Sequence, residues 1–330
     1  MSERIELRTL TDGGQRPADV ARDVAEFLDG AQQSLDLAQY DFHLAPETAS
    51  IVGDALRRAD ARGVRVRFVY NVDHANPIPV PPPPEPDVQL IATLPVEGKA
   101  IPGVPDLMHH KYVIRDSHSV WTGSVNWTDD SWSRQENVIV VVHSDAIAKA
   151  YDLDFGQLWE TVDVAQSGFV DPRWDDGVRA WFTPGHGEDT SARIAKLIRR
   201  ARARIRLCSP LITTGPVLGA LAQVISDRKV DVAGCVDATQ VREVIHQWRM
   251  NDNVSWKLPL LRQVMAGPFT GKESTPYGDG TVHDFMHAKV CVCDDTAFVG
   301  SFNLSRSGEQ TAENVLEIED AALADRLAAF

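Results

Sequence analysis

The chain has 330 residues, of which 43% are apolar, so it can bury a large core and is expected to form about two domains. Its 33 Lys and Arg residues and 47 Asp and Glu residues give a net charge of −14. This charge disfavours extended, sequence-independent binding of nucleic acid unless the protein has a local basic groove. No apolar run approaches the roughly 18 residues of a membrane span, so any lipid contact is expected to be peripheral.

Cysteine usage and the N-terminal sequence bear on the compartment. The cysteines show no paired framework, and they are Cys208, Cys235, Cys291 and Cys293. The first residues, MSERIELRTL, lack the apolar core of a signal peptide, so we expect a reduced, cytoplasmic protein. The two-residue spacing of Cys291 and Cys293 could suggest a metal site, but without a second pair, buried thiols in a strand are favoured. The sequence predicts neither a metal site nor a cofactor.

Strands and helices alternate through the first half of the chain. We expect strands at 5–10, 34–42, 64–71 and 138–142, and helices at 17–30, 47–63 and 144–159. Such alternation is typical of a mostly parallel sheet with helical crossovers. The segment PIPVPPPPEP at 77–86 is predicted to be extended polyproline, and a stiff surface loop is favoured over a substrate lid.

The same order of elements returns in the second half. After a linker at 166–176 we expect strands at 178–182, 205–209 and 230–236, and helices at 190–202 and 215–227. This repetition predicts an α/β protein of two similar halves, residues 1–165 and 166–330, each with a mixed, mostly parallel sheet and flanking helices. The basic residues of the 190–202 helix are expected to form its solvated face, with a phosphate-rich surface as the alternative, because its apolar residues keep helical spacing.

The two halves also share a polar motif. The stretch 108–137 recurs 177 to 178 residues later, with the same letters in the same order. The shared residues are His109, Lys111, Asp116, Gly123, Ser124, Asn126, Glu136 and Asn137 in the first copy, and His287, Lys289, Asp294, Gly300, Ser301, Asn303, Glu313 and Asn314 in the second.

The spacing of the shared letters predicts a hairpin in each copy. Residues two apart on a strand point the same way, so each His and its Lys should share a face. The Asp lies in a turn-forming cluster, and the return strand then carries the Gly, the Ser and the Asn. Both Asp side chains, Asp116 and Asp294, are expected to brace the hairpins rather than touch a substrate.

Both copies resemble the HxKxxxxD signature, with its trailing GSxN, of the phospholipase D superfamily. The resemblance covers essentially the whole chain and implies phosphodiesterase or phosphatidyltransferase activity at one site between two halves related by a pseudo-twofold axis. The residues implied to line that site are His109, Lys111, Asn126, His287, Lys289 and Asn303. The resemblance also places Glu136 and Glu313 near the position at which the family has a carboxylate that orients the histidine. Ser124 and Ser301 are expected to be supporting residues of the site.

The chemistry that the resemblance implies uses no metal. The two Lys and the two Asn would neutralise the non-bridging oxygens of a phosphodiester. One neutral imidazole would attack phosphorus to form a covalent phosphohistidine, and the other, protonated, would donate to the leaving alcohol and later activate water or an acceptor alcohol. In two-motif relatives the N-terminal histidine is usually the nucleophile, which assigns attack to His109 and proton donation to His287.

The substrate is the open question at this stage. A phospholipase D-like lipid phosphodiesterase is favoured over a cytosolic nuclease, because the chain is acidic, and an inactive binding module is the third alternative. Hydrolysis and transfer of the phosphatidyl group are not distinguished, and no obligate protein partner is evident. Trp127 and Trp132 follow the first motif; core positions are favoured for them over a wall for an acyl or base moiety.

Overall fold

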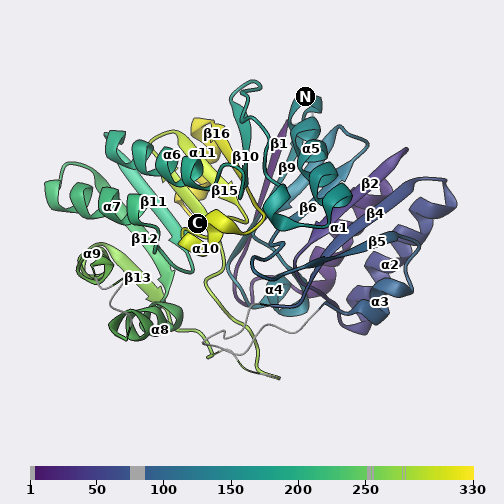
Figure 1. The fold of residues 1–330 in the computed structure, drawn as a ribbon, viewed down its shortest axis with the longest axis horizontal. Helices are drawn as coiled ribbons and strands as arrows, with labels where there is room; N and C mark the ends of the chain where they lie inside the picture. The colour runs from purple at the N-terminus through teal and green to yellow at the C-terminus, as the bar shows by residue number, and fades with distance from the viewer. Residues whose placement is uncertain (1–3, 75–85, 251–253, 255, 277, 279) are drawn as a thin grey trace.

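The structure, a computed structural model, describes residues 4–74, 86–250, 254, 256–276, 278 and 280–330. It contains two seven-stranded sheets that face each other, with helices between them and on their outer faces (Figure 1). A two-stranded pairing of β3 (Phe42–His43) with β8 (Trp127–Thr128) accompanies the first sheet.

The first sheet has the strand order β1-β9-β7-β6-β2-β4-β5. Its strands are β1 (Ile5–Leu10), β2 (Ser34–Gln39), β4 (Arg65–Val72), β5 (Glu97–Pro102), β6 (Lys111–Arg115), β7 (Ser119–Gly123) and β9 (Asn137–His143). The helices of this half are α1 (Pro17–Asp29), α2 (Pro46–Ala61), α3 (Val88–Ala92), α4 (Asp129–Ser133) and α5 (Asp145–Thr161), followed by the 3-10 helix η1 (Val164–Gln166).

The second sheet repeats that order as β10-β16-β15-β14-β11-β12-β13. Its strands are β10 (Val178–Thr183), β11 (Arg204–Ser209), β12 (Asp231–Asp237), β13 (Phe269–Lys272), β14 (Val290–Cys293), β15 (Thr296–Gly300) and β16 (Glu313–Glu319). The helices are α6 (Gly187–Arg200), α7 (Gly215–Asp227), α8 (Ala238–Arg249), α9 (Lys257–Met265), α10 (Arg306–Gln310) and α11 (Ala321–Ala328).

The α/β class and the two similar halves are confirmed, but the expected parallel majority is wrong at the level of strand pairs. In the first sheet only β2–β4 and β4–β5 are parallel, and the equivalent parallel pairs in the second are β11–β12 and β12–β13. The other pairings are antiparallel, because each polar motif forms a hairpin and the first and last strands of each half pair at its edge. The strand–helix alternation seen in the sequence therefore describes only the parallel strands of each half, β2, β4 and β5 in the first and β11, β12 and β13 in the second.

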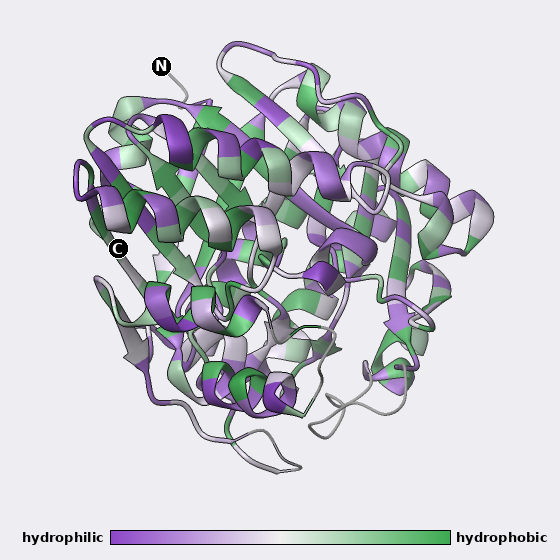
Figure 2. Cartoon of the chain, turned by 60° about the vertical axis from the view of Figure 1, so that its left-hand side comes forward, coloured by the Kyte–Doolittle hydropathy of each residue, from purple (hydrophilic) through white to green (hydrophobic). Residues whose placement is uncertain are grey.

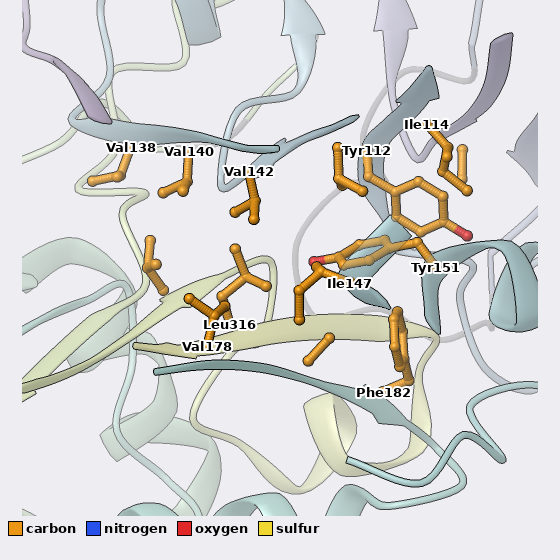
Figure 3. Close-up of a cluster of buried hydrophobic side chains, with 14 of the residues drawn as sticks. Tyr112, Ile114, Val138, Val140, Val142, Ile147, Tyr151, Val178, Phe182 and Leu316 are labelled. Atoms are coloured by element: carbon orange, nitrogen blue, oxygen red, sulfur yellow. The ribbon is translucent and has the colours of Figure 1, made fainter. Parts of the chain in front are cut away.

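Three apolar clusters hold these layers together. One lies under α1 and α2, and a second lies under α6 and α7, where the helices turn their apolar residues to the sheets and their polar residues outward (Figure 2). The third lies between the sheets and draws residues from both halves, among them Tyr112, Tyr151 and Phe182 (Figure 3). The Tyr151 and Phe182 rings meet edge to face, with centroids 4.8 Å apart.

The expected boundary between the halves, at residue 165, falls within the core that the two halves share. Position 165 falls inside η1, and Val164 and Val170 on either side are both buried in the cluster between the sheets. The strands β7 and β9 of the first sheet also contact β15 of the second. The two motif hairpins are therefore packed against each other across the pseudo-twofold.

Several sequence expectations are settled by burial. Trp127 and Trp132 are buried in the cluster under α1 and α2, so they are core residues. Cys291 and Cys293 are buried in β14, as expected of strand thiols. In α6 the residues Lys196, Arg199 and Arg200 are exposed, in agreement with a solvated face. Most of the proline-rich segment, 77–85, lies outside the described residues. Among the described residues, no helix is long and apolar enough to cross a membrane.

Candidate active site

Each motif histidine lies at the entrance to its hairpin and is tied to the opposite half of the chain. The strands themselves begin at Lys111 and Val290, slightly later than the spacing suggested, so the histidines precede them. The His109 backbone N–H donates to Ala312 O at 2.9 Å, and the His287 N–H donates to Glu136 O at 3.1 Å. These reciprocal hydrogen bonds bring the two histidines to the same interface.

The turn aspartates brace the hairpins, as expected. Asp116 accepts hydrogen bonds from the backbone N–H groups of residues 32 to 34, and Asp294 accepts them from residues 202 to 204. Partial burial acts to raise the pKa of each carboxyl, but the three N–H donors outweigh it and lower the pKa below its ordinary value. Both aspartates join the turn to the start of a neighbouring strand, away from the histidines.

The return strands β7 and β15 end at the motif glycines, so the Ser and the Asn of each motif follow the strand instead of lying in it, as the sequence had suggested. A Cβ on Gly123 would lie 2.0 Å from Val138 O, so the close approach of β7 and β9 requires glycine there, and Gly300 is in the same position. Ser124 Oγ donates to Asn137 Oδ1 at 2.7 Å and accepts from the Val138 N–H. Ser301 Oγ accepts from the Asn314 N–H. The two serines are thus committed to the scaffold and do not line the cavity.

A single cavity of about 930 Å³ is lined by both motif histidines and by both motif asparagines, Asn126 and Asn303. Asn126 is 9% exposed, and its Oδ1 has no hydrogen-bond partner among the described residues, so the amide is available to a ligand. Much of the remaining wall comes from the second half, between α7 and β14. The two halves are therefore equivalent at the histidines but not in the wall around them.

The motif lysines lie beneath the histidines. Lys111 and Lys289 are 1% and 4% exposed, and each Nζ donates to the carbonyl of its own histidine at 2.6 Å. The Lys111 Nζ also lies 4.9 Å from the centre of the Tyr40 ring. Burial lowers the pKa of both lysines and Glu313 acts against that shift, so the negative charge of a bound phosphate would further favour their charged forms.

Glu313 lies against His109 across the interface. Its Oε2 lies 2.9 Å from His109 Nδ1, and both side chains are buried. The His109 ring also packs on Tyr40, with ring centroids 4.4 Å apart. Because Nδ1 faces the carboxylate, Nε2 is the nitrogen that can reach the cavity.

His287 has a neutral partner instead. Its Nδ1 lies 3.1 Å from Asn137 Oδ1, and the Asn137 amide nitrogen donates to Ser131 O and Gln135 Oε1. The Asn137 oxygen is thereby fixed as the acceptor, so His287 Nδ1 donates and Nε2 again faces the cavity. Glu136, the counterpart of Glu313, pairs with Lys272 at 2.8 Å. The resemblance implied a carboxylate for each histidine, whereas the structure gives a carboxylate to His109 and an amide to His287.

Burial and like charges set the ionisation of this cluster. Burial, followed by the nearby lysines, lowers the pKa of both histidines well below the ordinary value, which favours neutral imidazoles in the empty site. Burial lowers the pKa of Lys111 to about 7 and raises the pKa of Glu313 to about 7. The two pKa values shift in opposite directions because burial away from water disfavours the charged form of each group, which is the protonated form of Lys111 and the deprotonated form of Glu313.

A second polar layer, which the sequence did not single out, lies behind Glu313. His110 is fully buried, with Nε2 3.0 Å from Asp154 Oδ2 and Nδ1 accepting from the Asn314 amide. Tyr151 OH and Thr122 Oγ1 donate to the Asn314 oxygen. This network fixes Asn314, the residue that follows Glu313. His110 and Asp154 both fall outside the repeated motif, so no pattern in the sequence marks them.

Comparisons with known proteins identify the family to which both motifs belong. The family described as "Cardiolipin synthase, PLD-like domain" matches the chain twice, over residues 24–159 and 194–330, and each match contains one histidine motif. The chain belongs to the phospholipase D superfamily. The repeat seen in the sequence is therefore a repeat of this family's domain.

Curated relatives match part of the chain. The mitochondrial cardiolipin hydrolase of Xenopus laevis is 33% identical over 143 residues, which is 42% of this chain and 61% of that protein. The human protein of the same name is 28% identical over 149 residues, 44% of this chain and 54% of that one. A phospholipase D of Rickettsia conorii is 27% identical over 135 residues, 41% of this chain and 62% of that one. The chain thus spans roughly 60% of the length of these relatives.

Solved structures match almost the whole chain. A phosphatidylserine synthase of Haemophilus influenzae superposes with a TM-score of 0.66 at 13% identity, over 99% of this chain and 84% of that one. A polyphosphate kinase of Porphyromonas gingivalis superposes with a TM-score of 0.63 at 12% identity, over 98% of this chain and 46% of that one. At these identities the likeness concerns the fold alone.

Proposed function

We propose that this protein is a phospholipid phosphodiesterase of the phospholipase D type, which works through a covalent phosphohistidine and without a metal. The observation that carries the proposal is the single cavity lined by His109 and His287, with a buried lysine under each histidine. Relatives named cardiolipin hydrolase and phospholipase D support the phospholipid substrate.

The asymmetry between the histidine partners supports His109 as the nucleophile. Attack by His109 Nε2 forms a P–N bond and puts positive charge on the ring, and Glu313 lies at Nδ1 to compensate it. Binding of the anionic phosphodiester offsets the charge of the nearby lysines, so His287 can take up a proton at Nε2. As the P–O bond to the leaving group breaks, His287 donates this proton to the departing oxygen. With an amide in place of a carboxylate at Nδ1, protonated His287 gives up its proton more readily than His109 would.

The second step returns the enzyme to its starting state. Neutral His287 accepts a proton from water, or from an acceptor alcohol, as its oxygen attacks phosphorus. The P–N bond breaks, His109 is released and the phosphate monoester or a new diester leaves. Throughout, Lys111 and Lys289, with the Asn126 and Asn303 amides, stabilise the charge on the non-bridging oxygens.

The wall of the cavity supports a lipid over a nucleic acid. It includes the apolar residues Leu211, Val244, Trp248, Val254 and Phe285. Beside it, Met250 at the end of α8 is 80% exposed and Trp256 at the start of α9 is 58% exposed, as in a surface that meets a lipid interface. The net charge of −14 argues in the same direction against long nucleic acid.

The experiment is a metal-free assay with three substrates. Phosphatidylcholine vesicles, a chromogenic bis-aryl phosphodiester and single-stranded DNA are each incubated with the protein in EDTA. The proposal expects turnover of the aryl ester and of the lipid, and the His109→Ala variant controls for contaminating activity. Cleavage of DNA without cleavage of lipid would instead support the nuclease, and no turnover of any substrate would support an inactive binding module.

A further inference from the structure

The cavity also contains a carboxyl group that the mechanism above does not use. Asp41 follows β2, and its backbone oxygen accepts from the Trp127 N–H at 3.0 Å, which fixes the residue in place. Asp41 is one of the residues that line the cavity, and it is only 8% exposed. Its Oδ1 is buried and has no hydrogen-bond partner among the described residues.

The surroundings of Asp41 leave its carboxyl unsatisfied. The charged groups that act on it are Lys111 and Asp130, which oppose each other. The Lys111 ammonium donates to His109 O and not to Asp41 Oδ1. Burial raises the pKa of Asp41 to about 7. A buried carboxyl without a donor is costly, so native proteins rarely keep one unless a ligand or an ordered water completes it.

We propose that Asp41 is a specificity residue that accepts a hydrogen bond from an O–H or N–H group of the substrate, close to the phosphodiester. The inference rests on the proposed function and names its substrate class, which is phosphodiesters that carry a hydroxyl or a primary ammonium within reach of the phosphate. Glycerol, ethanolamine and serine esters have such a donor in the headgroup. Choline carries a positive charge but no N–H or O–H, so it leaves Asp41 without a donor.

The donor has two possible sources in a phospholipid, and both present the same chemistry. It can belong to the headgroup, or to the free hydroxyl of a lysolipid on the retained glycerol. A site built around a hydrogen bond discriminates strongly against an analogue that lacks the donor, because the buried acceptor is then left unpaired. We therefore expect the discrimination to appear in kcat/KM.

The test compares wild-type protein with Asp41→Asn and Asp41→Leu on short-chain, soluble lipids. The substrates are phosphatidylglycerol, phosphatidylethanolamine, phosphatidylcholine and lysophosphatidylcholine, with the bis-aryl phosphodiester as a donor-free reference. For the wild type we expect a preference of about 10- to 100-fold for donor-bearing lipids over phosphatidylcholine. Asp41→Leu should abolish it, and Asp41→Asn, which keeps an acceptor oxygen without charge, should reduce it more for ethanolamine than for glycerol.

The outcomes separate cleanly. If the Asp41 variants lose the preference for glycerol and ethanolamine headgroups, the donor belongs to the headgroup. If they lose the preference for the lysolipid, the donor is the free hydroxyl on the retained glycerol. Equal ratios in all three proteins would overturn the role of Asp41, whereas no wild-type turnover of the aryl ester would mean that the proposed function itself had failed. If Asp41→Leu does not fold, inhibition of the folded Asp41→Asn variant by glycerophosphoethanolamine, against wild type, measures the same contact, and an unchanged inhibition constant overturns it.

Discussion

Substitution of Glu313 by Gln tests how the scaffold prepares the nucleophile. The change keeps the shape of the side chain and removes the charge that lies 2.9 Å from His109 Nδ1. Glu313 is 1% exposed, so no water replaces the lost interaction. The phosphohistidine would then carry its positive charge without a carboxylate partner.

The expected magnitude follows from the geometry. A buried carboxylate 2.9 Å from a positively charged ring contributes about as much as a hydrogen bond to a charged group, about 1.5–3 kcal/mol, which corresponds to a loss of about 10- to 150-fold in the rate of phosphohistidine formation. The pH dependence should change as well. Glu313 ionises and Lys111 loses its proton over the same range near pH 7, so the wild-type rate should pass through a maximum near that pH. The Gln variant should lack the rising limb of this profile.

Rapid-mixing kinetics with the bis-aryl phosphodiester measure this step as a burst of phenol. Glu136→Gln is the matched control, because Glu136 occupies the equivalent position but pairs with Lys272 rather than with a histidine. We expect less than about a fivefold change for the control. A burst rate that is unaffected by Glu313→Gln, or equally reduced by both substitutions, would refute the role of Glu313.

Three further outcomes are expected. Chelation with EDTA should leave aryl phosphodiester turnover intact, because Lys111 and Lys289 supply the positive charge; activity that is lost and then restored by a divalent ion would contradict this. Asp116→Asn should lower the free energy of unfolding by about 1–2 kcal/mol at pH 7. The pKa of Asp116 is lowered in the folded state, so the stability difference between variant and wild type, measured by urea unfolding, should disappear as the pH is lowered through that pKa. A variant as stable as wild type at pH 7 would contradict the bracing role of Asp116. Asp41→Asn should raise stability by about 1–3 kcal/mol at pH 8. Its raised pKa makes the wild type lose stability as the pH rises through about 7, so the gain should vanish near pH 4, and a destabilised variant at pH 8 would show a structural role instead.

The duplicated motif made much of the site predictable. Two copies of one pattern require two hairpins, and the turn role of Asp116 followed from the clustering of turn-forming residues around it. These two inferences succeeded because they concern residues close in sequence, where local geometry leaves few alternatives. The strand period of two does not account for the His–Lys pairs, because each histidine precedes its strand.

The contacts between the halves were not predictable in the same way. Both copies carry Glu-Asn, so nothing in the letters indicates that Glu313 contacts His109 while His287 contacts Asn137. That difference depends on Lys272, which lies on β13 and pairs with Glu136. Asp41 escaped notice for a related reason, since its importance comes from burial without a partner and not from any motif.

The central claim is that His109 forms the covalent bond to phosphorus and His287 supplies the proton. A low-pKa phenol leaves without protonation, so removal of the acid should spare the first step for an aryl ester. Rapid quench and intact-mass spectrometry of His109→Ala and His287→Ala after mixing with that ester measure the adduct directly. We expect His287→Ala to accumulate a phosphoryl adduct on His109 and His109→Ala to form none. A phosphoryl adduct on His287 in the His109→Ala protein would contradict the account and reverse the assignment.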